Sequence, residues 1–237
     1  MLLFILRHGD PIYNPDSLTD RGHLQAAALA KRLALYGLDH LYSSPMIRAQ
    51  QTAHPTEILL DKTAQIEEWT SESLAYSQFS KEVDGKRSWI FQGPLRNELR
   101  TARVLARGTQ WYEDPVFEGT KAKEGCERLQ KASDEFLARH GYRHDRENQR
   151  YIAERPNEER IAVFCHQGFG ISWLGTMLDI PLPIAWTSMN MSHTGMSVVE
   201  FKADENGLCT PMLLTLSNDS HLYREGYPTR YNNRLFF

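Results

Sequence analysis

Two short apolar runs of this sequence each lead directly into a histidine. LLFIL at residues 2–6 is followed by Arg7 and His8, and IAVFC at residues 161–165 is followed by His166. A neutral imidazole can act as a nucleophile or as a general acid or base, and arginine is suited to bidentate contacts with phosphate oxygens. These residue types therefore indicate chemistry on a phosphate group, provided that the fold brings the two runs together.

Strand-like and helical segments alternate along the chain, so the two runs are expected to be strands of one sheet. In open α/β sheets, functional groups gather beyond the carboxyl ends of the strands, which would place His8 and His166 in one crevice. Arg48 follows a third apolar run at residues 40–44 and could reach the same crevice. One such residue alone would be best explained as a surface or loop residue, but several at matching strand ends indicate a site.

The alternation predicts a three-layer α/β/α fold with a mostly parallel central sheet. Strands are expected at residues 2–6, 40–44, 64–68, 161–165, 195–201 and 211–217, and helices at residues 19–36, 46–60, 124–142 and 170–178. Residues 76–121 interrupt this rhythm and show no clean strand, so we expect them to form a helical insertion that caps the site. Residues 1–237 are otherwise interpreted as a single domain.

Composition and charge argue against several functional classes. A net charge of −3 over 237 residues gives no basic field for nucleic acid or for an anionic membrane surface. No run of 18 apolar residues occurs, and the first six residues lack the basic start and the length of a secretion signal. Cys126, Cys165 and Cys209 are widely spaced and odd in number, which is typical of a reducing compartment. We expect a cytoplasmic protein that binds neither nucleic acid nor membranes.

Five segments make the sequence resemble the histidine phosphatase superfamily, which includes phosphoglycerate mutases and many small-molecule phosphatases. They are RHG at 7–9, Asn14, LTDRGHLQA at 18–26, LYSSPMIRAQQTA at 41–53 and VFCHQG at 163–168. The resemblance is good toward both ends of the chain and poor over residues 76–121. It implies a metal-independent enzyme without a cofactor that acts on a small phosphorylated substrate.

The resemblance also implies a role for each residue at the strand ends. His8 would be the nucleophile that takes the phosphoryl group as phosphohistidine, with its other ring nitrogen held by a backbone carbonyl. Gly9 would permit that close backbone approach. Arg7, Arg48 and His166 would donate hydrogen bonds to the oxygens of the transferred group.

Two further residues would complete the binding of the phosphate. Asn14 would add an uncharged donor to the substrate. Gln167 departs from the family pattern, because many members have glycine after the second histidine. A glutamine keeps the backbone N–H that touches phosphate, and its side chain either adds a contact or narrows the pocket.

A leaving alkoxide needs a proton, and in this family a carboxyl usually supplies it. QIEEWTSES offers Glu67, Glu68 and Glu72, without the Gly-rich acidic turn that often follows in the family. The resemblance implies Glu72, because the family acid tends to lie about that far beyond the QTA segment, whereas strand alternation could instead point Glu68 inward. All three could also be solvated surface carboxylates.

Hydrolysis is favoured over mutase activity, because the adjacent arginine pair by which glycolytic mutases hold a substrate carboxylate is absent. Phosphoglycerate mutase-type phosphotransfer is the alternative, and a catalytically silent binding protein of the same fold also remains open. Cys165 is interpreted as a buried strand residue, because a thiol phosphatase would need an arginine where Ile171 stands. His140 and His144 have a spacing that suits a metal on a helix, but the glycine between them favours two exposed histidines.

The insertion and the C-terminal tail bear on substrate and partners. Residues 81–107 hold seven basic side chains, which form either a basic lid that favours multiply anionic substrates or a solvated surface. The tail at residues 221–237 is rich in tyrosine and arginine. We expect it to pack, either over the pocket or at a homodimer interface.

Overall fold

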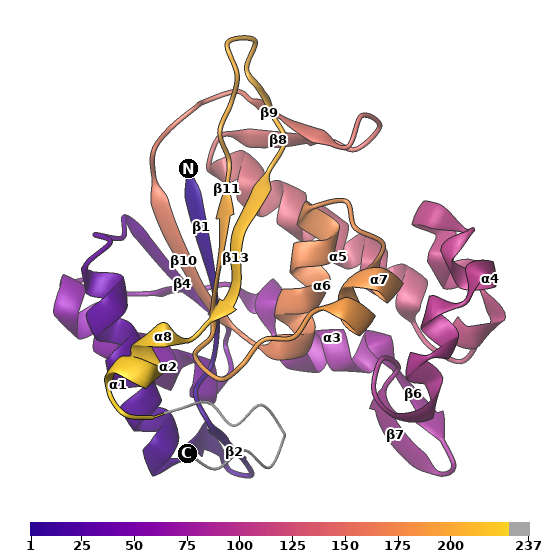
Figure 1. Cartoon of the computed structure of the whole chain (residues 1–237), viewed down its shortest axis with the longest axis horizontal. Helices are drawn as coiled ribbons and strands as arrows, with labels where there is room; N and C mark the ends of the chain where they lie inside the picture. Colours follow the sequence, from indigo (N-terminus) through magenta and orange to yellow (C-terminus); the bar gives the residue numbers. More distant parts are fainter. Residues whose placement is uncertain (228–237) are drawn as a thin grey trace.

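The computed structural model describes residues 1–227 and is built around one central sheet of six strands (Figure 1). In spatial order the strands are β13 (Met212–Asn218), β11 (Met196–Glu200), β1 (Leu2–Arg7), β10 (Arg160–Cys165), β4 (His40–Ser43) and β5 (Gln65–Ile66). β11 runs antiparallel to both of its neighbours, whereas β1, β10, β4 and β5 are parallel to one another. The expected mostly parallel sheet is therefore confirmed.

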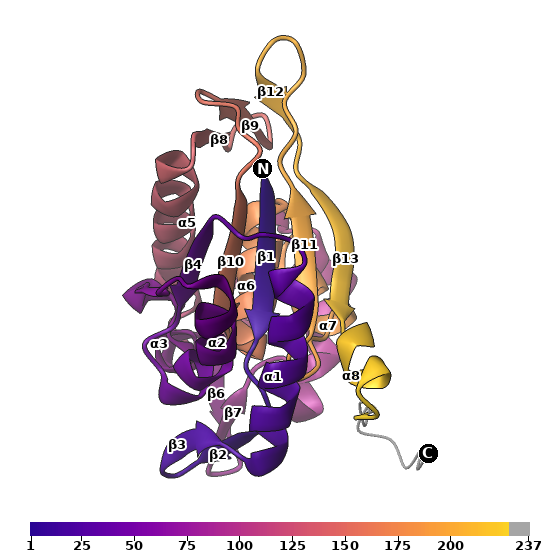
Figure 2. The same cartoon turned by 90° about the vertical axis from the view of Figure 1, so that its left-hand side faces the viewer.

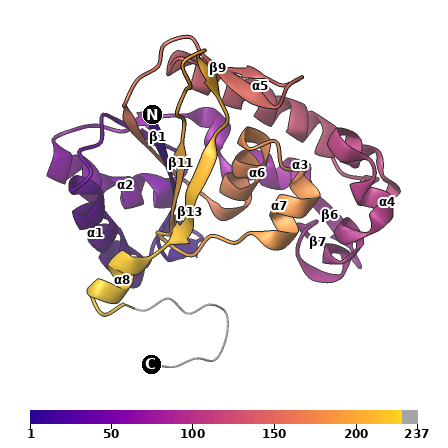
Figure 3. The same cartoon turned by 45° about the horizontal axis from the view of Figure 1, so that its top comes forward.

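Helices cover both faces of the sheet, which confirms the three layers (Figure 3). One face carries α1 (Asp20–Ala34), α2 (Ile47–Leu60) and α8 (Ser220–Arg224). The other carries α3 (Glu72–Phe79), α5 (Ala122–Arg139), α6 (Gln167–Met177) and α7 (Leu182–Ser188).

The side chains of β1 alternate between these two layers. Phe4 and Leu6 belong to the apolar cluster that includes residues of α1 and α2, and Leu3 and Ile5 belong to the cluster that includes residues of α5 and α6. All four are 1% exposed or less. Burial of an aliphatic side chain of this size contributes about 1.5–3 kcal/mol, so β1 is anchored from both sides.

The helix ends follow local sequence signals. Thr19 caps α1 by accepting the N–H of Gly22 at 3.0 Å, close to where the expected helix begins. α2 accommodates Pro55 without ending there. The expected strand at 64–68 shrinks to two residues, because the chain turns into a 3₁₀ helix at Glu68–Thr70.

The insertion at 76–121 is not wholly helical, which corrects the expectation. After α3 it forms a hairpin of β6 (Ser80–Val83) and β7 (Lys86–Trp89). Asp84 and Gly85 connect them with φ values of 53° and 73°. Asp-Gly favours this two-residue turn, so the sequence held the signal. The rest is α4 (Ala102–Leu105) and 3₁₀ helices at Gly93–Arg96, Glu98–Arg100, Gly108–Glu113 and Pro115–Phe117.

Two small sheets complete the fold. A hairpin of β2 (Pro11–Tyr13) and β3 (Asp16–Leu18) lies at the carboxyl end of β1, the same end at which β6 and β7 lie (Figure 2). At the opposite end, β8 (Tyr142–Asp145), β9 (Arg150–Ala153) and β12 (Leu208–Cys209) form a three-stranded sheet.

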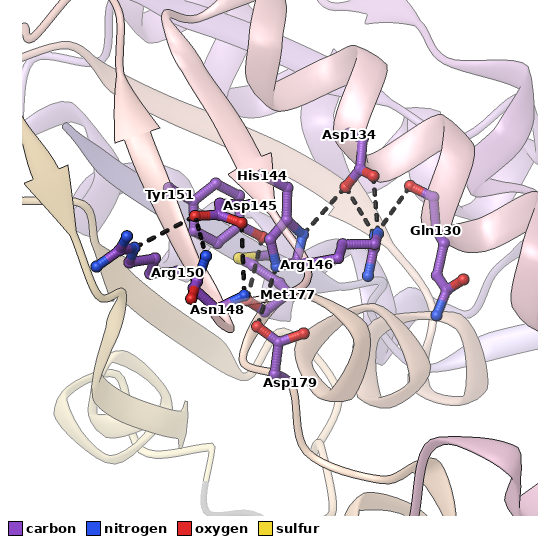
Figure 4. A network of polar contacts seen from close by, with 10 residues as sticks. All are labelled: Gln130, Asp134, His144, Asp145, Arg146, Asn148, Arg150, Tyr151, Met177 and Asp179. Carbon is purple, nitrogen blue, oxygen red and sulfur yellow. Dashed lines mark hydrogen bonds and ion pairs between the residues drawn. The ribbon is translucent and has the colours of Figure 1, made fainter.

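His144 on β8 is buried, contrary to expectation, and lies between two carboxylates (Figure 4). Its Nδ1 is 3.1 Å from Asp134 Oδ1 on α5, and its Nε2 is 3.0 Å from Asp179 Oδ2 after α6. The ring also stacks on Tyr151 with centroids 4.1 Å apart. Because both ring nitrogens have carboxylate acceptors, the arrangement suits an imidazolium.

His140 is buried as well, so the expected exposure is wrong for both histidines. Its Nδ1 is 3.0 Å from Glu159 Oε2 and its Nε2 is 3.1 Å from the hydroxyl of Tyr42. The helical spacing assumed for the pair does not exist, because α5 ends at Arg139 and His144 belongs to a strand.

Within residues 1–227, no helix is long and apolar enough to cross a membrane. The greater part of the expected packing tail, residues 228–237, lies outside the described residues.

Candidate active site

A cavity of about 490 Å³ opens at the carboxyl edge of the sheet and contains most of the residues expected at the site. Its walls come from the ends of β1 and β4, from the β2–β3 hairpin, and from α3, α6 and the insertion. The lining residues are Arg7, His8, Tyr13, Asp16, Met46, Arg48, Glu72, Ser73, Tyr76, Trp89, Phe91, Gln92, Gln167 and Gly168.

The register of the sheet brings the two histidines together. Arg7 pairs with Cys165, and the N–H of His8 donates to the carbonyl of Cys165 at 2.9 Å. His8 and His166 therefore leave adjacent strands at the same level, and their ring centroids are 5.2 Å apart.

His8 has one ring nitrogen fixed and one available. Its Nδ1 donates to the carbonyl oxygen of Gly9 at 2.7 Å, which leaves the lone pair on Nε2. Burial lowers the pKa of His8 well below its ordinary value, and the nearby Arg7 guanidinium acts in the same direction. The imidazole is therefore neutral at ordinary pH, as a nucleophile requires.

Gly9 sets the turn that holds this histidine. A Cβ at this position would lie 2.7 Å from the carbonyl oxygen of Gly22, so only glycine fits against the start of α1. The N–H of Gly9 donates to Thr52 Oγ1 at 3.0 Å, and that hydroxyl donates to the Arg48 carbonyl. Gly9 supports His8 through its backbone and does not line the cavity.

Arg7 and Arg48 supply two guanidinium groups to the cavity, each held in place on one side. Arg7 donates to the carbonyl of Met191 at 2.5 Å and to His193 Nε2 at 2.8 Å. Arg48 donates to Asp16 Oδ1 at 2.6 Å. The Nε atoms of both arginines are buried without a partner among the described residues. Two fixed cations with donors to spare suit a phosphate group.

His166 lies behind His8 and is fully buried, although it does not line the cavity. Its Nε2 is 2.7 Å from Ser44 Oγ, and its Nδ1 has no partner among the described residues. Burial lowers the pKa of His166 well below its ordinary value, with His8 as the next cause. Both imidazoles are thus neutral, and the charge in the site comes from arginine.

Glu72 is the carboxyl that reaches the cavity. Its Oε1 accepts the N–H of Gly168 at 3.0 Å, and its Oε2 accepts that of Phe169 at 2.8 Å. Burial raises its pKa, although both hydrogen bonds oppose the shift. Glu68 is exposed, and Glu67 is paired with Arg139 at 2.5 Å, so neither lines the cavity.

Of the two other residues expected to bind substrate, one lines the cavity and one does not. Gln167 lines the cavity, and its side-chain amide donates to Asn190 Oδ1 at 2.5 Å. Asn14 is exposed at the turn between β2 and β3 and is not among the lining residues.

Sequence reasoning missed His193, which accepts from Arg7 and lies 3.4 Å from Asp10 through its Nδ1. The sequence signal for His193 is its position just before β11. An antiparallel strand begins at the edge of the sheet where its parallel neighbours end, so this position indicates the site edge. It also missed the cavity position of Trp89, which depends on the hairpin. Burial raises the pKa of the Cys165 thiol, in agreement with its interpretation as a strand residue.

Comparisons with known proteins agree with this fold. The family model of the histidine phosphatase superfamily, branch 1, matches residues 3–210. No curated protein sequence shows a significant match.

Two solved structures are similar in fold. A mycobacterial glucosyl-3-phosphoglycerate phosphatase with inorganic phosphate is 18% identical, with a TM-score of 0.60 over 93% of this chain and 98% of that chain. Phosphoserine phosphatase from Entamoeba histolytica with 3-phosphoglyceric acid is 20% identical, with a TM-score of 0.56 over 93% and 98%. With the family match over nearly its whole length, the chain belongs to the histidine phosphatase superfamily.

Proposed function

We propose that the protein hydrolyses phosphate monoesters of small molecules through a phosphohistidine on His8. The observation that carries this proposal is the hydrogen bond from His8 Nδ1 to the carbonyl of Gly9 at 2.7 Å. It fixes the tautomer in which Nε2 has a free lone pair at the cavity that Arg7 and Arg48 also line.

The first step transfers the phosphoryl group to the enzyme. His8 Nε2 forms a bond to phosphorus while the bond from phosphorus to the ester oxygen breaks. Protonated Glu72 gives its proton to the leaving oxygen, so the product departs as a neutral alcohol. Donors from Arg7 and Arg48 hold the equatorial oxygens, because phosphoryl transfer depends mainly on positioning and charge stabilisation. His166 lies behind His8, and its Nδ1, which has no partner among the described residues, adds a donor when the phosphate is bound.

The second step releases phosphate. The Glu72 carboxylate takes a proton from a water molecule. At the same time the water oxygen bonds to phosphorus, and the bond between phosphorus and His8 Nε2 breaks. Inorganic phosphate leaves, and the enzyme returns to neutral His8 and protonated Glu72. Because the positive charge comes from two arginines, no metal ion is needed in either step.

Glu72 in the cavity favours an enzyme over a silent binding protein, because anion binding does not require a carboxyl beside His8, whereas the leaving oxygen requires an acid there. Mutase activity requires the phosphohistidine to outlast product exchange. Both of the similar structures described above are named as phosphatases, which supports hydrolysis for this chain.

The test is release of phosphate from an aryl phosphate with a chelator present. We expect turnover by the wild type, none by His8→Ala, and normal turnover by His54→Ala, which removes an exposed histidine outside the cavity. Acid-labile phosphate should be trapped on the wild-type protein and not on His8→Ala. Turnover that survives His8→Ala, or that stops in chelator, would contradict the proposal.

A further inference from the structure

The insertion gives the cavity an aromatic wall formed by Tyr76, Trp89 and Phe91. The ring centroids of Tyr76 and Trp89 are 5.2 Å apart, and those of Trp89 and Phe91 are 5.0 Å apart. All three residues line the cavity together with the catalytic candidates. The hydroxyl of Tyr76 donates to the carbonyl of Arg87 at 2.9 Å, so its polar end is already satisfied by protein.

Trp89 lies next to the candidate proton donor. A Cβ added to Gly168 would lie 2.6 Å from the six-membered ring of Trp89 and 3.1 Å from Glu72 Oε1. The indole therefore covers the same helical turn whose N–H groups bind Glu72. Because Glu72 protonates the leaving oxygen, the aromatic wall adjoins the alcohol part of the substrate rather than its phosphate.

The charges around the cavity are unevenly distributed. Among the described residues that line it, Arg7 and Arg48 are the only permanent cations, and both lie with His8 at the phosphate end. Asp16 and Glu72 line it as well. Among the described lining residues, a second anionic group on the substrate would meet the aromatic wall, the acid Glu72 and the carboxylate of Asp16, with no cation beyond Arg7 and Arg48 to offset its desolvation.

The basic residues of the insertion do not change this balance, which corrects the idea of a basic lid. Arg103 and Arg107 both bind the buried carboxylate of Asp114, at 2.6 and 3.3 Å. Four others donate to groups of the insertion, α3 or α7, and none of these four lines the cavity: Lys81, Arg87, Arg96 and Arg100. These six side chains hold the insertion together, and the seventh, Lys86, is exposed and does not line the cavity.

We infer that the substrate is a phosphate ester of an uncharged alcohol that carries a ring or a comparable apolar group, and that Trp89 determines this preference. The inference rests on the proposed function, because it assigns the aromatic wall to the leaving alcohol. Stacked and edge-to-face ring contacts add to the hydrophobic contribution of the buried area, so a ring next to Trp89 is worth about a tenfold gain in affinity.

Three phosphonates that are not hydrolysed test this preference by calorimetric binding. Ethylphosphonate, 2-phenylethylphosphonate and 2-carboxyethylphosphonate share a stem and differ only in the terminal hydrogen, ring or carboxylate. We expect the phenyl compound to bind about tenfold tighter than ethylphosphonate, and the carboxyl compound to bind more weakly than ethylphosphonate.

Variants then assign the preference to Trp89. Trp89→Ala should remove most of the difference between the phenyl and ethyl compounds, and Trp89→Phe should retain it. Tyr223→Ala removes a ring that is 84% exposed and outside the cavity, and it should leave the difference unchanged. Tightest binding of the carboxyl compound, no binding of any of the three, or an undiminished phenyl preference in Trp89→Ala would overturn the inference.

Turnover of an aryl phosphate by the same preparation keeps the two proposals separate. Turnover without a ring preference removes only the inference about the substrate. A ring preference without turnover removes the proposed hydrolysis and leaves the aromatic binding site.

Discussion

The carboxylate of Glu72 accepts the backbone N–H of Gly168 at 3.0 Å and so lies at the first turn of α6, directly after His166. One side chain therefore meets two requirements. It binds free N–H groups at a helix start, and it places a carboxyl in the cavity beside the nucleophile. Burial outweighs the hydrogen bonds and raises the pKa of Glu72, which favours the protonated acid.

Glu72→Gln should therefore lower kcat for alkyl phosphates by about 10²–10³-fold, because a poor leaving group depends on the acid. The loss should be much smaller for aryl phosphates, whose leaving groups need less protonation. Glu68→Gln is the matched control, since Glu68 is exposed four residues earlier in the chain. Steady-state kinetics on both ester types would measure this, and equal losses in the two variants would exclude Glu72 as the proton donor.

The pH profile should have an acid limb set by His8 and an alkaline limb set by Glu72. Activity needs neutral His8, whose pKa burial and Arg7 lower, so the acid limb should lie below the ordinary histidine value of about 6.5. It also needs protonated Glu72, whose raised pKa should move the alkaline limb above the ordinary range of a carboxyl. Plots of kcat/KM against pH, corrected for ionisation of the substrate, would check both limbs.

Glu72→Gln supplies the internal control for that profile. With an alkyl phosphate, the residual activity of this variant should keep the acid limb and lose the alkaline limb, because only the second belongs to Glu72. An acid limb at or above the ordinary histidine value would contradict the assignment of neutral His8 as the nucleophile.

Arg48→Lys should lower kcat/KM by about 10²-fold, because an ammonium group cannot replace two fixed N–H donors on the phosphate oxygens. Asp16→Asn is the control. It removes the carboxylate that holds Arg48 at 2.6 Å but keeps the guanidinium, so its loss should be smaller. Thermal unfolding of both variants would show that they are folded, and wild-type kinetics in Arg48→Lys would argue against a phosphate contact.

The sequence was sufficient to locate the residues that directly follow the strands of the sheet. His8 and His166 follow continuous apolar runs, and parallel pairing of such runs leaves little choice about which edge they share. The prediction for the two histidines needed only local pattern and the general rule for open sheets. Glu72 was favoured over Glu68 because the family resemblance implies an acid at about that distance beyond the QTA segment.

The aromatic wall and the buried histidines needed information that the pattern does not contain. Trp89 reaches the cavity through a hairpin whose Asp84-Gly85 signal lies in an otherwise irregular segment. His140 and His144 were expected to be exposed, because they lie around the glycine at which the helix was expected to end. The chain does turn at Gly141, with φ of +91°, but Glu159 lies against His140, and Asp134 and Asp179 lie against His144. These partners come from other elements, so the local pattern could not reveal the burial.

The buried contact of His144 with Asp134 and Asp179 provides a last prediction, on stability. Burial would lower the pKa of His144, but the hydrogen bonds to both carboxylates outweigh it and raise the pKa. The contribution of the imidazolium is therefore complete below the unfolded pKa of about 6.5 and is lost as pH rises through the higher folded pKa.

His144→Gln should consequently lower the free energy of unfolding by about 1.5–3 kcal/mol near pH 6, because it removes the charged hydrogen bonds to Asp179 and Asp134 and leaves Asp134 with Arg146 alone. The difference from wild type should shrink as pH rises through the folded pKa of His144. Urea denaturation below and above that pKa would measure it, with His54→Gln as a control at an exposed histidine. A difference that stayed constant with pH would mean that His144 is neutral in the folded protein and acts only by packing on Tyr151.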